Sequence, residues 1–209
     1  MKSIIATVKS LSKIQILVVI LLIAGLGLVV FFGVRSVRSF RQLQYIQEQG
    51  LFTATSSPDA VRSWMNIRFV ATAYAIPEEY LFAELDLPLE LRRSDDSLAQ
   101  LNRVLQLGRS DQGDYPAIID KVRDAIERYR KNPVSPGLEG DVRPWMSIQY
   151  IANSTGIPME YIFEEIGLPM AGNEYKPLGQ LSDEFRYGRH RGALVEAVQS
   201  ALNQYGGGR

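Results

Sequence analysis

One block of sequence occurs twice in this chain, and this repetition limits the possible folds more than any other feature. The segment Val61–Phe82 returns as Val142–Phe163, with a shift of about 81 residues and no gap. Repeated helical units build architectures that present surfaces, whereas an active site needs one asymmetric cluster of reactive groups. The sequence holds no such cluster, so we expect a protein that is not an enzyme and has no cofactor or metal site.

Both copies carry the same signal for the start of a helix. Asn66 and Ser147, good N-cap residues, occupy equivalent positions. Proline disfavours a helical residue before it and suits the first turn of the following helix. The predicted elements are first helices at Ile67–Tyr74 and Ile148–Thr155, then second helices after Pro77 to about Leu87 and after Pro158 to about Gly167.

The similarity between the copies continues more loosely to their ends. Apolar residues with helical spacing correspond in two further segments, which are Leu98, Leu101, Ile118, Val122 and Ile126 in the first copy and Leu178, Leu181, Leu194, Val198 and Leu202 in the second. The offset falls between these segments, which indicates a short deletion opposite Ser110–Asp114. Each unit then has about four short helices. A unit this small folds alone only marginally, so we expect the two to pack together or on a partner.

An apolar run precedes the repeats. Ile16–Val34 contains no charged residue over about 19 residues, enough for a helix to span the hydrocarbon core of a bilayer. The run is longer than a signal-peptide core and lacks a small-residue cleavage site, so a retained anchor is favoured over a cleaved signal. The predicted fold is all-α, with a single N-terminal transmembrane helix followed by two tandem homologous helical modules. The predicted divisions are a tail at 1–13, the transmembrane helix at 14–34, a juxtamembrane helix and linker at 35–57, repeats at 58–131 and 142–207, and a linker at 132–141.

Basic residues lie on both sides of the apolar run. Lys2, Lys9 and Lys13 precede it, and Arg35, Arg38 and Arg41 follow it, with no acidic residue among positions 1–41. The three arginines share roughly one helix face and are candidate contacts to lipid headgroups, with ordinary snorkelling at a helix end as the competing interpretation. The two sides of the run carry nearly equal positive charge, so the positive-inside rule gives only a weak preference. That preference is for a cytoplasmic tail with the repeats outside the cytoplasm.

Charge and composition exclude several classes of site. The remainder of the chain has a net charge of about −6, which gives no general attraction to nucleic acid. The chain has no cysteine, which excludes disulfides, zinc–thiolate sites and thiol catalysis. Its one histidine, His190, lies in a basic loop with no nucleophile, carboxylate or further ligand nearby in sequence, so we expect an exposed loop residue.

The centre of each copy resembles the helix-turn-helix motif of DNA-binding proteins. Ile151-Ala152, then Gly156-Ile157-Pro158, then Ile162 carry the resemblance, and the first copy has Ala75 in place of the turn glycine. The resemblance implies that the second helix would enter the major groove. That helix is acidic in both copies and has no Arg or Lys of its own, with carboxylates at Glu78, Glu79, Glu84 and Asp86 and at Glu160, Glu164 and Glu165. Such charges repel phosphates and argue against nucleic-acid binding.

A broader pattern also resembles a known type of domain. W-M-x-I-x-Y-I-A, G-I-P, E-x-x-G-L-P and P-L-G-x-L follow one another in residues 142–205, and the first copy departs at Ala75, Asp86 and Leu107. The pattern is similar to a small tandem helical domain on the soluble ends of some bacterial inner-membrane proteins. The resemblance implies a bacterial inner-membrane setting and a helical domain without an assigned reaction.

Trp64 and Trp145 are the candidate partner contacts. Tryptophan is enriched at binding centres, although their identical place beside a helix start also fits a buried structural role. The sequence therefore predicts a single-pass, membrane-anchored, non-catalytic interaction or assembly subunit of a membrane-associated complex, with the bilayer and a protein as partners. A homo-oligomer stays open. The alternative is a membrane-tethered regulator that binds nucleic acid through its helix-turn-helix-like repeats.

Overall fold

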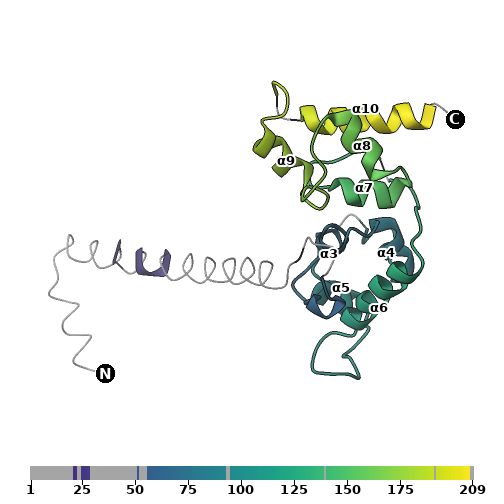
Figure 1. Ribbon diagram of the computed structural model, residues 1–209. Coiled ribbons are helices and arrows are strands. Elements are labelled where there is room, and N and C mark those ends of the chain that lie inside the picture. The colour runs from purple at the N-terminus through teal and green to yellow at the C-terminus, as the bar shows by residue number, and fades with distance from the viewer. Residues whose placement is uncertain are drawn as a thin grey trace, which may run out of the picture. The chain divides into compact units, whose positions relative to one another are not determined.

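The computed structural model describes residues 21–22, 25–28, 51, 56–92, 95–138, 140–190 and 192–207 (Figure 1). The chain divides into two compact units, Met1–Glu48 and Gln49–Arg209. The described part contains helices and no strands, which confirms the all-α prediction. Most of the predicted transmembrane helix, all of the tail at 1–13, and Arg35, Arg38 and Arg41 lie outside the described residues.

The predicted membrane span is described only in part. Leu21, Leu22, Leu26 and Leu28 are helical, and each side chain is more than half exposed. Among the residues that the structure describes, none of the helices combines the length and the apolar character needed to cross a bilayer.

Within its described residues, each copy contains four α-helices. In the first copy a 3₁₀ helix, η1 (Pro58–Ala60), precedes α3 (Ile67–Tyr74), α4 (Glu78–Glu84), α5 (Leu98–Val104) and α6 (Ile118–Lys131). The second copy contains α7 (Ile148–Thr155), α8 (Met159–Ile166), α9 (Leu178–Phe185) and α10 (Ala193–Gly207). Figure 1 shows the first set in blue to teal and the second in green to yellow.

The predicted starts of α3 and α7 are confirmed together with their caps. The Asn66 side chain accepts a hydrogen bond from the Phe69 amide at 2.7 Å, and the Ser147 hydroxyl accepts one from the Tyr150 amide at 3.1 Å. The predicted end of α4 near Leu87 is wrong, because this helix ends at Glu84. Asp86 takes a left-handed conformation with φ of 50°, and the chain leaves the helical path there.

The two copies share equivalent tertiary contacts as well as similar sequences. The Leu98 amide donates to the Met65 carbonyl at 2.7 Å, and the equivalent Leu178 amide donates to the Met146 carbonyl at 2.8 Å. These bonds join the third helix of each copy to the segment before the first. The last helix is held by a tyrosine pair in both copies, with ring centroids 5.0 Å apart for Tyr80–Tyr129 and 4.9 Å apart for Tyr161–Tyr205.

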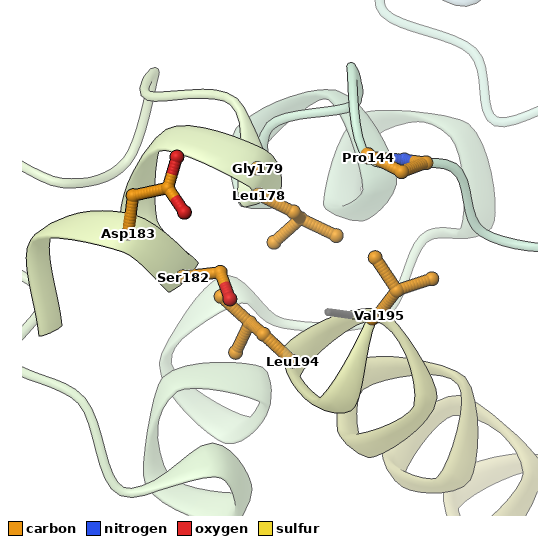
Figure 2. Close-up of a pocket in the computed structure, with 8 residues that line it drawn as sticks. Pro144, Leu178, Gly179, Ser182, Asp183, Leu194 and Val195 are labelled. Atoms are coloured by element: carbon orange, nitrogen blue, oxygen red, sulfur yellow. The ribbon is translucent and has the colours of Figure 1, made fainter. Parts of the chain in front are cut away.

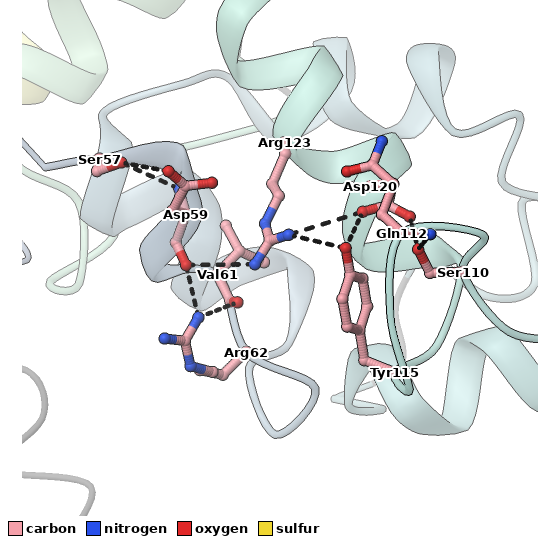
Figure 3. A network of polar contacts seen from close by, with 9 residues as sticks. All are labelled: Ser57, Asp59, Val61, Arg62, Ser110, Gln112, Tyr115, Asp120 and Arg123. Carbon is pink, nitrogen blue, oxygen red and sulfur yellow. Dashed lines mark hydrogen bonds and ion pairs between the residues drawn. The ribbon is translucent and has the colours of Figure 1, made fainter.

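The longer loop of the first copy, residues 109–117, is fixed by a polar network (Figure 3). The Asp120 carboxylate accepts hydrogen bonds from the Tyr115 hydroxyl at 2.8 Å and from the Ser110 hydroxyl. Arg123 approaches Asp120 at 3.6 Å and donates to the Asp59 carbonyl at 3.3 Å. The first two turns of α6 therefore hold both its preceding loop, through Asp120, and η1, through Arg123.

Ala75, which ends α3, adopts a conformation better suited to glycine. Its φ is 52°, and the equivalent Gly156 has φ of 73°. A left-handed conformation destabilises an L-residue by roughly 1–2 kcal/mol, whereas glycine adopts it freely. We expect Ala75→Gly to raise the free energy of unfolding by about 1 kcal/mol and Gly156→Ala to lower it by at least that amount. Urea denaturation of both variants measures the two shifts, and a loss of stability in Ala75→Gly would contradict this account.

Candidate functional site

The two copies meet through unlike faces. The turn after α3 in the first copy lies against α7 of the second, where the Asn153 amide donates to the Ala75 carbonyl at 2.6 Å. The Tyr150 hydroxyl accepts a hydrogen bond from the Glu78 amide at 3.3 Å, and its side chain is only 1% exposed. The expectation that the copies pack together is thus confirmed, and the helix-turn-helix-like turn of the first copy forms part of the contact.

Trp145 lies beside this contact and is half-buried. Its ring packs edge-on against Tyr150, with centroids 5.2 Å apart. The guanidinium carbon of Arg68, from the first copy, lies 5.5 Å from the centre of the Trp145 ring. Arg68 also approaches Glu78 at 3.4 Å and Asp95 at 3.2 Å. This arginine therefore links the carboxylates of one copy to the tryptophan of the other through a cation–π contact.

A groove of about 580 Å³ opens at this junction. Its charged lining comes from Arg68, Glu78, Glu79, Arg92, Asp141 and Arg143, and its aromatic lining from Phe82, Trp145 and Tyr150. Arg143 is exposed, and Arg92 lies over the Phe82 ring at 5.6 Å. A surface with large aromatic side chains and charges of both signs is suited to a protein segment, because aromatic anchors supply contact area and paired charges supply specificity.

The two candidate tryptophans have different surroundings. Trp64 is half-buried and packs edge-on against Phe69 at 5.1 Å, within the first copy. Trp145 lines the groove at the junction. Arg68, Arg143 and Tyr150 were not predicted from sequence patterns as site residues. A signal for Tyr150 was present, because the matched position in the first copy is Phe69, and this pair of otherwise similar residues differs by the hydroxyl that accepts from Glu78.

The acidic second helices are partly neutralised by arginines from other helices. Arg128 of α6 binds Glu84 at 2.6 Å, and Arg68 of α3 approaches Glu78 at 3.4 Å. The sequence interpretation took account only of the charges on the helix itself, and on α4 these are partly offset by arginines of α3 and α6. On α8 the carboxylates are solvent-facing, and Glu160, Glu164 and Glu165 are all exposed.

His190 is exposed, as predicted, but a carboxylate lies near it. Its Nε2 atom is 3.1 Å from a Glu196 oxygen, and both side chains are more than half exposed. The contact joins the loop before α10 to the first turn of that helix. Within the described ranges, no group of three or more His, Cys, Asp or Glu side chains is arranged to hold a metal ion.

Two tyrosines near the junction make stability sensitive to alkaline pH. Burial raises the pKa of Tyr150, and burial together with the neighbouring Tyr80 raises the pKa of Tyr129 to about 12. In the unfolded chain both hydroxyls ionise near pH 10, so this contribution to stability is complete below about pH 10 and is lost as the pH rises toward 12. We expect the urea midpoint to fall across this window and Tyr129→Phe to flatten the fall. An unchanged slope in that variant would contradict the assignment.

Comparisons of the chain with protein-family models, with curated proteins and with solved structures found no match. Function is therefore inferred from this chain's own residues. The features that carry the inference are the groove at the junction of the copies and Trp145 in its wall.

Proposed function

We propose that this chain is a single-pass, membrane-anchored, non-catalytic interaction subunit that binds a protein partner through the groove between its two copies. The observation that carries the proposal is the place of Trp145, half-buried in a groove of about 580 Å³ with Arg68 against its ring. Binding energy at protein interfaces concentrates in Trp, Tyr and Arg side chains at partly enclosed sites. The groove offers Trp145 and three arginines, Arg68, Arg92 and Arg143, while the buried Tyr150 packs against the Trp145 ring.

The groove favours a partner segment of mixed charge. Arg92 and Arg143 can pair with acidic side chains, and the exposed Asp141 can pair with basic ones. Such pairing adds more to specificity and orientation than to affinity. Attachment to one membrane raises the local concentration of both partners, so a modest affinity suffices for assembly.

A photo-crosslinking residue placed at Arg143 tests the proposal. Arg143 is exposed and lines the groove, while the exposed Arg62 occupies the equivalent position in the first copy and is not part of the groove lining. In cells of the native host we expect a discrete adduct from position 143 and none of the same mass from position 62. Equal adducts from both positions, or none from either, would reject this groove as the binding site.

Trp145→Ala and Trp64→Ala form a matched pair for the same assay. The first removes a wall of the groove, and the second removes the equivalent half-buried ring elsewhere. We expect loss of Trp145 to reduce the adduct from position 143 by at least about tenfold, because truncation of an interface hot spot weakens binding by about 2 kcal/mol or more. Melting curves of both variants separate weakened binding from unfolding.

The membrane part of the proposal is supported by the apolar run Ile16–Val34 and by the exposed leucines within it, Leu21, Leu22, Leu26 and Leu28. A bacterial inner membrane with both copies outside the cytoplasm is the setting proposed. Protease added to intact spheroplasts should then remove a C-terminal tag. Protection of the tag until lysis would place the copies in the cytoplasm and reverse the proposed orientation.

Nucleic-acid binding is the alternative proposal, through the helix-turn-helix-like turns. The exposed carboxylates of α8 oppose it, and in the first copy the Glu78 amide at the start of α4 donates to Tyr150 of the second copy. We therefore expect the detergent-solubilised chain to pass through a DNA column at low salt. Retention that weakens as salt rises would favour this alternative.

A further inference from the structure

A second pocket lies in the second copy, between the start of α10 and α9 (Figure 2). Its volume is about 210 Å³. Leu178 and Ser182 of α9 lie on one side, and Leu194 and Val195 of α10 lie on the other. Pro144 completes the lining, directly between Arg143 and Trp145 of the groove described above. One short segment thus contributes to both hollows.

The first copy shows what fills the equivalent space. There Asn102 stands at the position of Ser182 and is only 7% exposed. Its amide nitrogen donates to the Gly108 carbonyl at 2.8 Å, and its amide oxygen accepts from the Ile118 amide at 2.9 Å. Ile118 is the residue equivalent to Leu194. In the first copy, the Asn102 carboxamide therefore provides the hydrogen-bond acceptor for a backbone amide at the start of the last helix.

Most of the residues that line this space are smaller in the second copy. Ser182 replaces Asn102, and the other reductions are Ala99 to Gly179, Arg103 to Asp183, Pro116 to Gly192 and Ile119 to Val195, whereas Pro144 is larger than its equivalent Ser63. All five of the smaller residues line the pocket. The pocket thus lies where most side chains of the second copy are smaller than the equivalent side chains of the first.

We infer that this pocket receives the carboxamide side chain of an asparagine or glutamine presented by a partner protein. The inference rests on the proposed function, because it names what the partner presents beside the Arg143–Trp145 segment. The occupant is neutral, because Asp183 lines the pocket and would repel a carboxylate. The carboxamide takes the place of the Asn102 side chain, which in the first copy bonds the Ile118 amide and the Gly108 carbonyl, and Leu194, the equivalent of Ile118, lines the pocket.

Methyl-selective NMR of the full chain in mild detergent tests this inference. The probes are the N-acetyl α-methyl esters of asparagine, aspartate and leucine, in which only the asparagine side chain is a primary carboxamide, and the signals are the methyl groups of Leu194 and Val195. We expect saturable shifts with the asparagine probe and affinities at least about tenfold weaker for the other two, because only the asparagine side chain can both donate and accept. Stronger binding of the aspartate or leucine probe, or no shift with any probe, would overturn the inference.

Ser182→Asn supplies the second arm of the test. This variant gives the pocket the side chain that the first copy already has, so we expect a higher melting temperature and loss of the response to the asparagine probe. Ser200→Asn, the same change at an exposed position of α10, should alter neither. A lower melting temperature for Ser182→Asn together with an unchanged probe response would overturn the inference.

The two proposals can fail separately. An adduct from position 143 without a methyl response leaves the partner proposal standing and removes the carboxamide pocket. A methyl response without any adduct supports the chemistry of the pocket and removes the groove as the partner site.

Discussion

Replacement of Tyr150 by alanine is expected to lower the free energy of unfolding by about 3–5 kcal/mol, the range found when buried aromatic side chains are truncated. Tyr150 is among the largest fully buried side chains, and its ring packs against Trp145. Its hydroxyl also accepts the hydrogen bond from the Glu78 amide that joins the two copies. The substitution therefore removes core packing and an inter-copy contact together.

Phe69 provides the matched control for this prediction. It occupies the equivalent position in the first copy and is only half-buried. Phe69→Ala should lower the free energy of unfolding by roughly 1–2 kcal/mol, because less apolar surface is lost. Urea denaturation of the full chain measures both changes, and limited proteolysis of the linker near residues 132–138 reports separation of the copies. Faster cleavage in Phe69→Ala than in Tyr150→Ala would contradict the role of Tyr150 at the junction.

Asn102→Ala should lower the free energy of unfolding by about 1–3 kcal/mol, the penalty for one buried polar group left without its partner. Its carboxamide makes two hydrogen bonds with backbone groups, to Gly108 and from Ile118. Removal of the side chain takes the acceptor from the buried Ile118 amide, whereas the Gly108 carbonyl keeps the hydrogen bond from the Ala117 amide. The cap residue of α6, Ala117, has no side-chain hydrogen bond to the helix, so Asn102 serves as the cap from a different helix.

Two further substitutions isolate this effect. Asn102→Asp keeps the acceptor for the Ile118 amide but places a carboxylate against the Gly108 carbonyl, so it should lose most of the stability that Asn102→Ala loses. Ser182→Ala, at the equivalent position of the second copy, should change stability by less than about 0.5 kcal/mol. Amide exchange in the first turn of α6 localises the loss. A Ser182→Ala effect as large as that of Asn102→Ala would show that the two positions do not differ in this way.

Local signals in the sequence were sufficient to place the first helix of each copy. An N-cap residue at one end and an Ile-Pro pair after the other depend only on adjacent residues, and α3 and α7 begin and end as predicted. The early end of α4 was not predicted. Asp86 has a left-handed conformation, and the equivalent residue in the second copy is Gly167. A glycine in a sequence indicates that conformation, whereas an aspartate does not.

The candidate site depends on residues far apart in the chain, and sequence patterns say little about such pairs. Trp145 was a candidate from its residue type and its repetition. Its partner Arg68 was not, because an arginine on a short helix is ordinarily a solvated side chain. Asn102 was likewise unremarked, since its two hydrogen bonds reach Gly108 and Ile118 across a loop whose path the sequence does not determine.

The contact between unlike faces bears on how many units can be joined in this way. A contact between two different faces leaves one unused face at each end, so further units can be added there unless both faces are blocked. At one end, α3 carries Phe69 and Thr72 where α7 carries Tyr150 and Asn153, so it lacks the hydroxyl and the carboxamide that hold the turn of a neighbour. At the other end, the linker lies on the second turn, where the Gly137 amide donates to the Ser154 carbonyl at 2.8 Å. Neither end therefore offers a third unit the matching half of this contact.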